Sequence, residues 1–134
     1  MSNLVLAKNR NTSPETLELL ANDVDPHVRR NVAINPNTPL KALEHLANDN
    51  VSIVRLNVAW NFNTLPEILE RLANDEVNEV RMYVVDNPNA SPETLVRLAN
   101  DRDYWVRYYV ARNPNTPQYI IQYIKTTEFL NYYD

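Results

Sequence analysis

The residues of this sequence best suited to chemistry are four aspartate–arginine pairs. In each pair the arginine follows the aspartate by six positions, and the pairs recur every 26 residues: Asp23 and Arg29, Asp49 and Arg55, Asp75 and Arg81, and Asp101 and Arg107. A catalytic site is not copied four times along one chain, so the repetition favours a structural network. We expect each aspartate to cap backbone N–H groups of the next helix, and each arginine to reach an aspartate of its own or an adjacent repeat.

Other residues suited to catalysis or metal binding are few. His27 and His45 are the only histidines, they occupy different positions of the repeat, and no acidic residues surround them at metal-ligand spacing. The absence of cysteine excludes thiolate ligands and a cysteine nucleophile, and the absence of glycine excludes glycine-rich phosphate loops. The sequence therefore predicts no catalytic residue, no metal and no cofactor.

A longer frame surrounds the charged pairs and repeats with the same step. It reads Val-Arg-x-x-Val-Ala-x-Asn-Pro-Asn-Thr-Pro-x-x-x-Leu-x-x-Leu-Ala-Asn-Asp, and it is almost unbroken from Val28 to Asp49 and again from Val106 to Pro117. Proline and capping residues divide each repeat into two helices of about eight or nine residues, such as those expected at 14–21 and 26–34. Helices this short are marginal in water, so they must be stabilised by packing on neighbouring copies.

This pattern predicts an all-α protein, an α-solenoid or superhelix of about five stacked 26-residue repeats, with some 3₁₀ helix at the proline-rich junctions. We expect residues 1–134 to form a single helical-repeat domain. Its units cover about residues 1–27, 28–53, 54–79, 80–105 and 106–134. The first unit is partial, and the last departs from the frame after Pro117, as expected of a C-terminal cap.

Asparagine is expected to replace glycine at the helix ends. Because it tolerates positive φ better than most residues, we interpret two columns as left-handed C-terminal caps. The columns are Asn22, Asn48, Asn74 and Asn100, and Asn9, Asn35, Asn61, Asn87 and Asn113. Thr64 and Glu67 also have the spacing of a capping box at a helix N-terminus.

The frame resembles the leucine-rich repeat variant, a helical family similar to HEAT repeats. The HEAT likeness rests on the six-residue spacing of the four aspartate–arginine pairs. The resemblance implies a stacked superhelix and, usually, a binding role, and it implies no reaction. Some proteins of this family carry a cysteine-ligated iron–sulfur segment before the repeats, and the absence of cysteine means that this cofactor cannot be carried over.

The residues that vary between repeats gather on one face of the Val-Arg helix. When Val28, Val32 and Ala33 face the core, a rotation of about 100° per residue turns positions 27, 30, 31 and 34 away from it. In later units these positions hold large apolar and aromatic residues of the types enriched at protein interfaces. We name this set the aromatic stripe: Ile53, Leu56, Trp60, Met82, Tyr83, Trp105, Tyr108, Tyr109 and Arg112.

The stripe predicts a non-enzymatic scaffold that binds a protein or peptide. Two alternatives stay open: self-association through the stripe or the tail from Phe129 to Tyr133, and packing of the aromatic residues on one another within the chain. Nucleic-acid binding is disfavoured by the net charge of −4, although Arg30, Arg55 and Arg112 accompany aromatic residues. No signal peptide and no apolar run of roughly 20 residues is evident, so we expect no membrane association and a cytoplasmic location.

Overall fold

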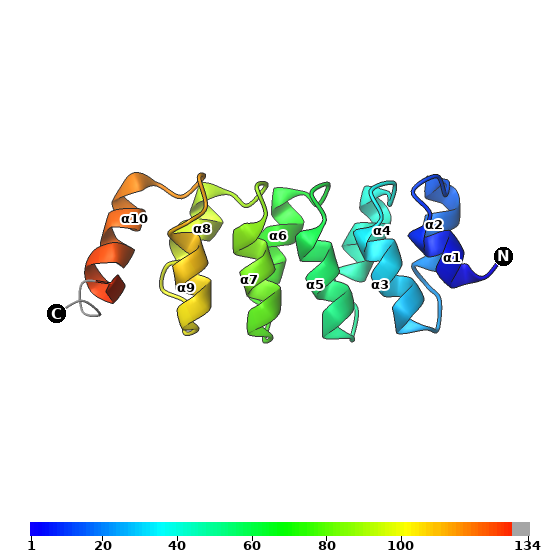
Figure 1. Cartoon of the computed structure of the whole chain (residues 1–134), viewed down its shortest axis with the longest axis horizontal. Coiled ribbons are helices and arrows are strands. Elements are labelled where there is room, and N and C mark those ends of the chain that lie inside the picture. Colours follow the sequence, from blue (N-terminus) through cyan, green and yellow to red (C-terminus); the bar gives the residue numbers. More distant parts are fainter. Residues whose placement is uncertain (130–134) are drawn as a thin grey trace.

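The computed structural model describes residues 1–129, and this part of the chain consists of helices and short loops without strands. The helices stand in two rows, with one helix of each row in every repeat (Figure 1). The first row comprises α1 (Asn3–Lys8), α3 (Pro26–Ile34), α5 (Ser52–Trp60), α7 (Asn78–Asp86) and α9 (Tyr104–Val110). The second row comprises α2 (Pro14–Leu20), α4 (Leu40–Leu46), α6 (Pro66–Leu72), α8 (Pro92–Leu98) and α10 (Gln118–Ile124). The predicted all-α solenoid is confirmed.

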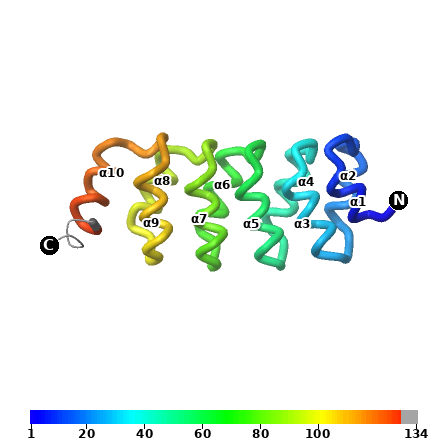
Figure 2. The backbone as a smooth tube through the Cα atoms, in the orientation of Figure 1, coloured from blue at the N-terminus to red at the C-terminus, as the bar shows by residue number. Residues whose placement is uncertain are grey.

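Each repeat contacts its immediate neighbours. First-row helices pack side by side in chain order, and each also packs on second-row helices beside it in sequence. Figure 2 shows the chain following the same path in successive repeats, with α1 and α10 at opposite ends of the array. Loops that leave the first row form the upper edge of Figure 1, and loops that leave the second row form its lower edge.

Local sequence signals set where the helices begin. The Ser13 hydroxyl accepts a hydrogen bond from the Thr16 N–H and so caps α2, and Ser91 caps α8 in the same way. Proline occupies the first turn of α2, α3, α6 and α8, where its missing N–H costs no helical hydrogen bond. The helix expected at 26–34 has those bounds in the structure.

The core is one continuous cluster between the two rows. From the first row it takes a column of fully buried valines, Val32, Val58, Val84 and Val110. From the second row it takes an equivalent column of leucines, Leu17, Leu43, Leu69 and Leu95. Each such side chain contributes about 1.5–3 kcal/mol through burial, which is how helices of seven to nine residues become stable in this chain.

Three local expectations are wrong. No residue between 1 and 129 has positive φ, and Asn35 and Asn61 at the helix ends have extended backbones with φ of −68° and −70°. Thr64 caps no helix. Its buried hydroxyl donates to the Val58 carbonyl at 2.7 Å, and the N-cap residue of α6 is Leu65. The expected 3₁₀ helix is not found among the described residues, which instead include a π-helical turn, η1 (Lys125–Phe129).

Candidate functional site

Equivalent ion pairs recur in successive repeats along the lower edge. Arg29 Nε lies 2.7 Å from Asp49 Oδ2, Arg55 Nε lies 2.7 Å from Asp75 Oδ2, and Arg81 Nε lies 2.8 Å from Asp101 Oδ2. In each pair the arginine lies on a first-row helix and binds the aspartate 20 residues later, after the second-row helix of the same repeat. A second nitrogen, Nη2, contacts the other carboxylate oxygen. We call this series the aspartate–arginine ladder.

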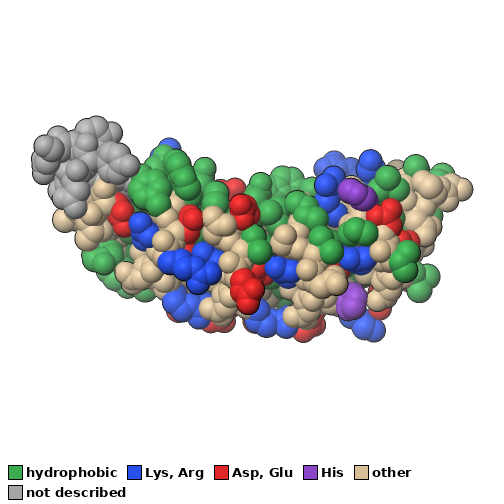
Figure 3. Space-filling view, turned by 90° about the horizontal axis from the view of Figure 1, so that it is seen from below, with side chains coloured by type: hydrophobic (Ala, Val, Ile, Leu, Met, Phe, Trp, Pro, Cys, Tyr) green, Lys and Arg blue, Asp and Glu red, His purple; other side chains and the backbone are tan. Residues whose placement is uncertain are grey.

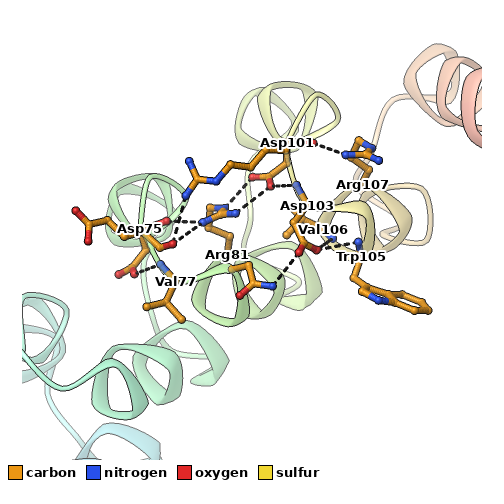
Figure 4. A network of polar contacts seen from close by, with 11 residues as sticks. Asp75, Val77, Arg81, Asp101, Asp103, Trp105, Val106 and Arg107 are labelled. Carbon is orange, nitrogen blue, oxygen red and sulfur yellow. Dashed lines mark hydrogen bonds and ion pairs between the residues drawn. The ribbon is translucent and has the colours of Figure 1, made fainter.

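The same arginines also bind backward, to the last loop of the preceding repeat. Arg81 Nη1 donates to the main-chain carbonyl of Asp75 at 2.7 Å, while its other nitrogens bind Asp101 (Figure 4). Asp75 Oδ1 in turn accepts the Val77 N–H at 2.9 Å, immediately before α7 begins. One arginine therefore joins the last loop of the preceding repeat to the last loop of its own repeat, and charge-assisted bonds of this kind are strong ones.

The ladder ends with different residues at each terminus. Asn3 occupies the position equivalent to Arg29, and its amide donates to Asp23 Oδ2 at 2.8 Å. At the other end Arg107 Nε binds Glu128 Oε1 at 2.6 Å. Glu128 stands one position later than the 26-residue step requires, and it lies in the π-helical turn, which accommodates one extra residue.

Hydrogen bonds shift the pKa values of Asp23, Arg29, Arg55 and Asp75. Burial works to raise the pKa of the Asp75 carboxyl, but hydrogen bonds from Arg55 and from the Val77 N–H outweigh burial and hold that pKa below its ordinary value of 3.8. The bond to Asp75 raises the pKa of Arg55. Backbone and side-chain donors, from Asp25 and Asn3, lower the pKa of Asp23. These groups are therefore held as ions at neutral pH, as structural residues require.

A second ladder, which the sequence interpretation missed, runs along the upper edge and consists of asparagines. Asn61 Nδ2 donates to the Ala33 carbonyl at 2.8 Å and to the Asn35 carbonyl at 3.3 Å, both in the preceding repeat. Its Oδ1 accepts the Asn63 N–H at 2.8 Å. The equivalent buried residues, with equivalent bonds, are Asn35, Asn87 and Asn113. We call these four residues the asparagine ladder.

The asparagine ladder explains why the left-handed cap is not needed. The last carbonyls of a helix lack partners within that helix. Here the carbonyl of Ala33, in α3, is bound by Asn61 of the next repeat instead. The fixed spacing of the Asn-Pro-Asn segments was a sequence signal for this ladder, but local propensity alone does not reveal a bond partner 28 residues away.

The aromatic stripe lies on the first-row helices, and the structure divides it into two groups. Four members are exposed: Ile53 by 39%, Trp60 by 44%, Trp105 by 52%, and Arg112, which lies in the turn after α9. The others are half-buried, and four of these pack against the core: Leu56, Met82, Tyr83 and Tyr109. These four side chains present one surface to the core and another to solvent.

Aromatic residues of the stripe gather most densely on α9. Tyr108 makes edge contacts with Trp105 and Tyr109, at ring-centroid distances of 5.4 and 5.3 Å. The Arg112 guanidinium lies 4.9 Å from the Tyr108 ring centroid and donates to the Tyr108 hydroxyl. Tyr104, which the sequence interpretation omitted, stacks on Tyr108 at 6.3 Å. Its position four residues before Tyr108 was a signal that helical spacing offered.

A second aromatic pair stands at the end of α5. Trp60 and Phe62 lie with ring centroids 6.1 Å apart, and Phe62 is exposed by 64%. Phe62 was also omitted from the predicted site, because it lies in a loop where helical spacing does not apply. Asn57, by contrast, was expected to point outward with the stripe, but it is buried and its amide donates to the Ile53 carbonyl at 2.8 Å.

A shallow hollow of about 160 Å³ opens between α7 and α9. Its lining is Met82, Tyr83 and Asp86 from α7 and Tyr109 from α9. Larger hollows of about 420 and 480 Å³ open between repeats on the lower edge, and their linings include Asp49, Asp75, Arg55 and Arg29, which are already bound in the ladder. The hollow between α7 and α9 therefore differs, since no ladder residue lines it.

The two long sides of the array differ in chemistry. Figure 3 shows hydrophobic side chains gathered along one long side, and charged side chains over the middle and the opposite side. The second row contributes exposed ion pairs that bridge repeats, including Arg71 with Glu44 and Arg97 with Glu70. In the described part of the chain, no cluster of three or more His, Asp or Glu residues is placed to hold a metal ion. No helix among residues 1–129 has the length and apolarity to cross a membrane.

Comparison with known families agrees with this geometry. Residues 79–103, which run from the start of α7 to the loop after α8, match the family described as leucine rich repeat variant. This stretch, about one repeat long, is similar to the leucine rich repeat variant family. The match confirms the family predicted from the repeat frame, and the matched leucine rich repeat variant unit contains both Arg81 and Asp101 of the ladder. A search of curated proteins found no match.

Proposed function

We propose that this chain is a non-enzymatic scaffold that binds a protein or peptide along the aromatic stripe. The observation that carries the proposal is the exposure of both tryptophans, Trp60 by 44% and Trp105 by 52%, on the first-row helices, where Ile34 and Ile53 are exposed as well. Exposed tryptophans lose conformational freedom cheaply and bury a large area on binding, so they are favoured at the centres of interfaces. The absence of cysteine is compatible with a cytoplasmic partner.

Two of the arginines near the aromatic residues are bound within the chain, which supports a protein partner over a nucleic acid. Arg55, one of the cations expected near the aromatic residues, is bound to Asp75 and to the Asp49 carbonyl. Arg112 is held against Tyr108. With a net charge of −4, the chain offers little attraction for a phosphate backbone.

The proposal is tested by selecting binders from a randomised peptide library and titrating them against stripe variants. Both tryptophans of the chain lie in the stripe, so intrinsic fluorescence reports binding directly. Trp60→Ala or Tyr109→Ala is expected to weaken binding about tenfold or more. Glu93→Ala, in α8 of the second row, is the matched control and is expected to bind as the wild type does.

Unfolding measurements on the same variants separate binding from stability. Trp60→Ala is expected to retain nearly the full free energy of unfolding, because much of this side chain is already exposed. A variant that unfolds would place Trp60 in the core and defeat the proposal.

Self-association through the stripe is the second candidate, since the same exposed tryptophans suit a second copy of the chain. Light scattering across a dilution series decides it: a molecular mass that stays monomeric at every concentration rules it out. The tail from Phe129 to Tyr133, which the sequence interpretation offered as another interface, lies outside the described residues apart from the backbone of Phe129.

A further inference from the structure

The hollow between α7 and α9 combines apolar walls with one carboxylate. Met82, Tyr83 and Tyr109 are half-buried and supply the walls, and Asp86 is exposed at the rim. Its volume of about 160 Å³ is close to that of a cavity that holds a single benzene molecule, so it suits one side chain and not a folded element.

Asp86 stands where a negative charge is unfavourable. It is the last residue of α7, and the carbonyl groups at a helix C-terminus already carry partial negative charge. Among the described residues no side chain forms an ion pair or a hydrogen bond with the Asp86 carboxylate. Glu79 lies two helical turns earlier on α7, is also exposed, and adds a second negative charge to this face.

The positively charged side chains of Arg112 and Arg81, near the hollow, already bind other residues. Arg112 occupies the position on the next repeat that is equivalent to Asp86, but its guanidinium is held over Tyr108 and donates to the Tyr108 hydroxyl. Arg81, on α7 itself, is buried in the ladder with Asp101. The hollow thus has a local excess of negative charge that the chain itself does not neutralise.

We infer that this hollow takes the lysine or arginine side chain of the bound segment. The aliphatic stem of such a side chain packs against Met82 and Tyr83, as long cationic side chains do on apolar surfaces. Its charged group then reaches the Asp86 carboxylate, with a tyrosine ring available for a cation–π contact. This inference rests on the proposed function, and it specifies a basic residue in the partner that enters between the third and fourth full repeats.

The test is an NMR titration of the whole chain with Nα-acetyl-lysinamide and, in parallel, with Nα-acetyl-norleucinamide. The two probes share the aliphatic stem and differ in the ammonium group. The lysine probe is expected to shift the resonances of Met82, Tyr83, Asp86 and Tyr109, and to bind about threefold to tenfold more tightly than the norleucine probe.

Two variants, each of which replaces a carboxylate by an amide of the same shape, test whether the ammonium group of the lysine probe binds Asp86. Asp86→Asn is expected to abolish the difference between the two probes, whereas Glu93→Gln, an exposed carboxylate in α8, is expected to preserve it. Equal binding of the two probes, or a preference that survives in Asp86→Asn, would overturn the inference.

A failure of the inference about the hollow can be distinguished from a failure of the proposed function. Selected peptides that lose affinity with Trp60→Ala but bind Asp86→Asn normally would support a binding stripe and refute the cationic pocket. A library that yields no stripe-dependent peptide would refute the proposed function, whatever the small probes show.

Discussion

Trp60 and Asn61 are adjacent in sequence and have opposite roles in the structure. Trp60 is exposed by 44% and differs from its counterparts Ile34 and Asp86 in the neighbouring repeats. Asn61 is buried, is identical in each repeat, and binds two carbonyl groups of the preceding repeat. The comparison teaches that the repeated residues hold the stack together and the varied residues face outward.

The reason is geometric. A residue that bonds to the next copy of itself must have the same environment in every copy, so its identity is fixed by the stacking step. A residue that points away from the stack meets no such condition, and each repeat is free to present a different side chain there. Neighbouring positions of one array can therefore serve different purposes, one stabilising the stack and the other recognising a partner.

The largest effect is expected from the aspartate–arginine ladder. Arg81→Ala removes a side chain that is 5% exposed and leaves Asp101, which is 7% exposed, without its ion-pair partner. Leaving a buried charge unpaired costs about 3 kcal/mol or more, a large part of the stability of a small domain. Urea unfolding followed by circular dichroism measures the loss.

The control is Arg97→Ala, which breaks a pair with Glu70 that bridges two repeats and in which both side chains are about half exposed. Its cost is expected to be about 0–1 kcal/mol. Equal losses for the two variants would contradict the assignment of stability to the buried ladder.

An intermediate loss of stability is expected from substitutions at the adjacent residues Trp60 and Asn61. Asn61→Ala leaves the Ala33 carbonyl without its donor and is expected to cost about 1–3 kcal/mol, because a buried polar group then lacks a hydrogen bond. Trp60→Ala is expected to cost about 1 kcal/mol or less and to lower peptide affinity instead. Thermal unfolding and fluorescence titration of both variants give the two quantities, and a reversal of their order would break the comparison.

The smallest change in stability is expected when the pH is lowered. Because the pKa values of Asp23 and Asp75 are lower in the folded chain than their ordinary value of 3.8, these groups add stability above that pH. That stability is lost as the pH falls through the lowered values, since the unfolded chain then binds more protons. Urea midpoints measured between pH 7 and pH 2 are expected to fall below about pH 4.

The matched variant for the acid experiment is Asp75→Asn, which keeps the shape of the side chain and removes its titration. Its stability at neutral pH is expected to be lower, and its decline in acid less steep. A decline as steep as that of the wild type would show that carboxylates other than Asp75 cause the acid sensitivity.

Much of the candidate site was predictable because helical spacing places its residues on one face. Trp60, Met82, Tyr83, Trp105 and Tyr109 do lie on the first-row helices, as expected. Phe62 was missed because a loop position has no helical phase. The exposed share of each side chain was not predictable, since it depends on how closely neighbouring helices approach.

The sequence by itself determined the repeat, the helix bounds and the core, because each follows from spacing and from propensities within a few residues. It also limited the partner of each arginine to two candidates, the aspartate of its own repeat or of an adjacent one. Only the tertiary structure decided that Arg55 pairs with Asp75, and that Asn61 binds the helix end before it. These bonds join residues 20 and 28 positions apart in the chain, and their distances are set by the packing of the two rows and of successive repeats, which is a property of the stack as a whole.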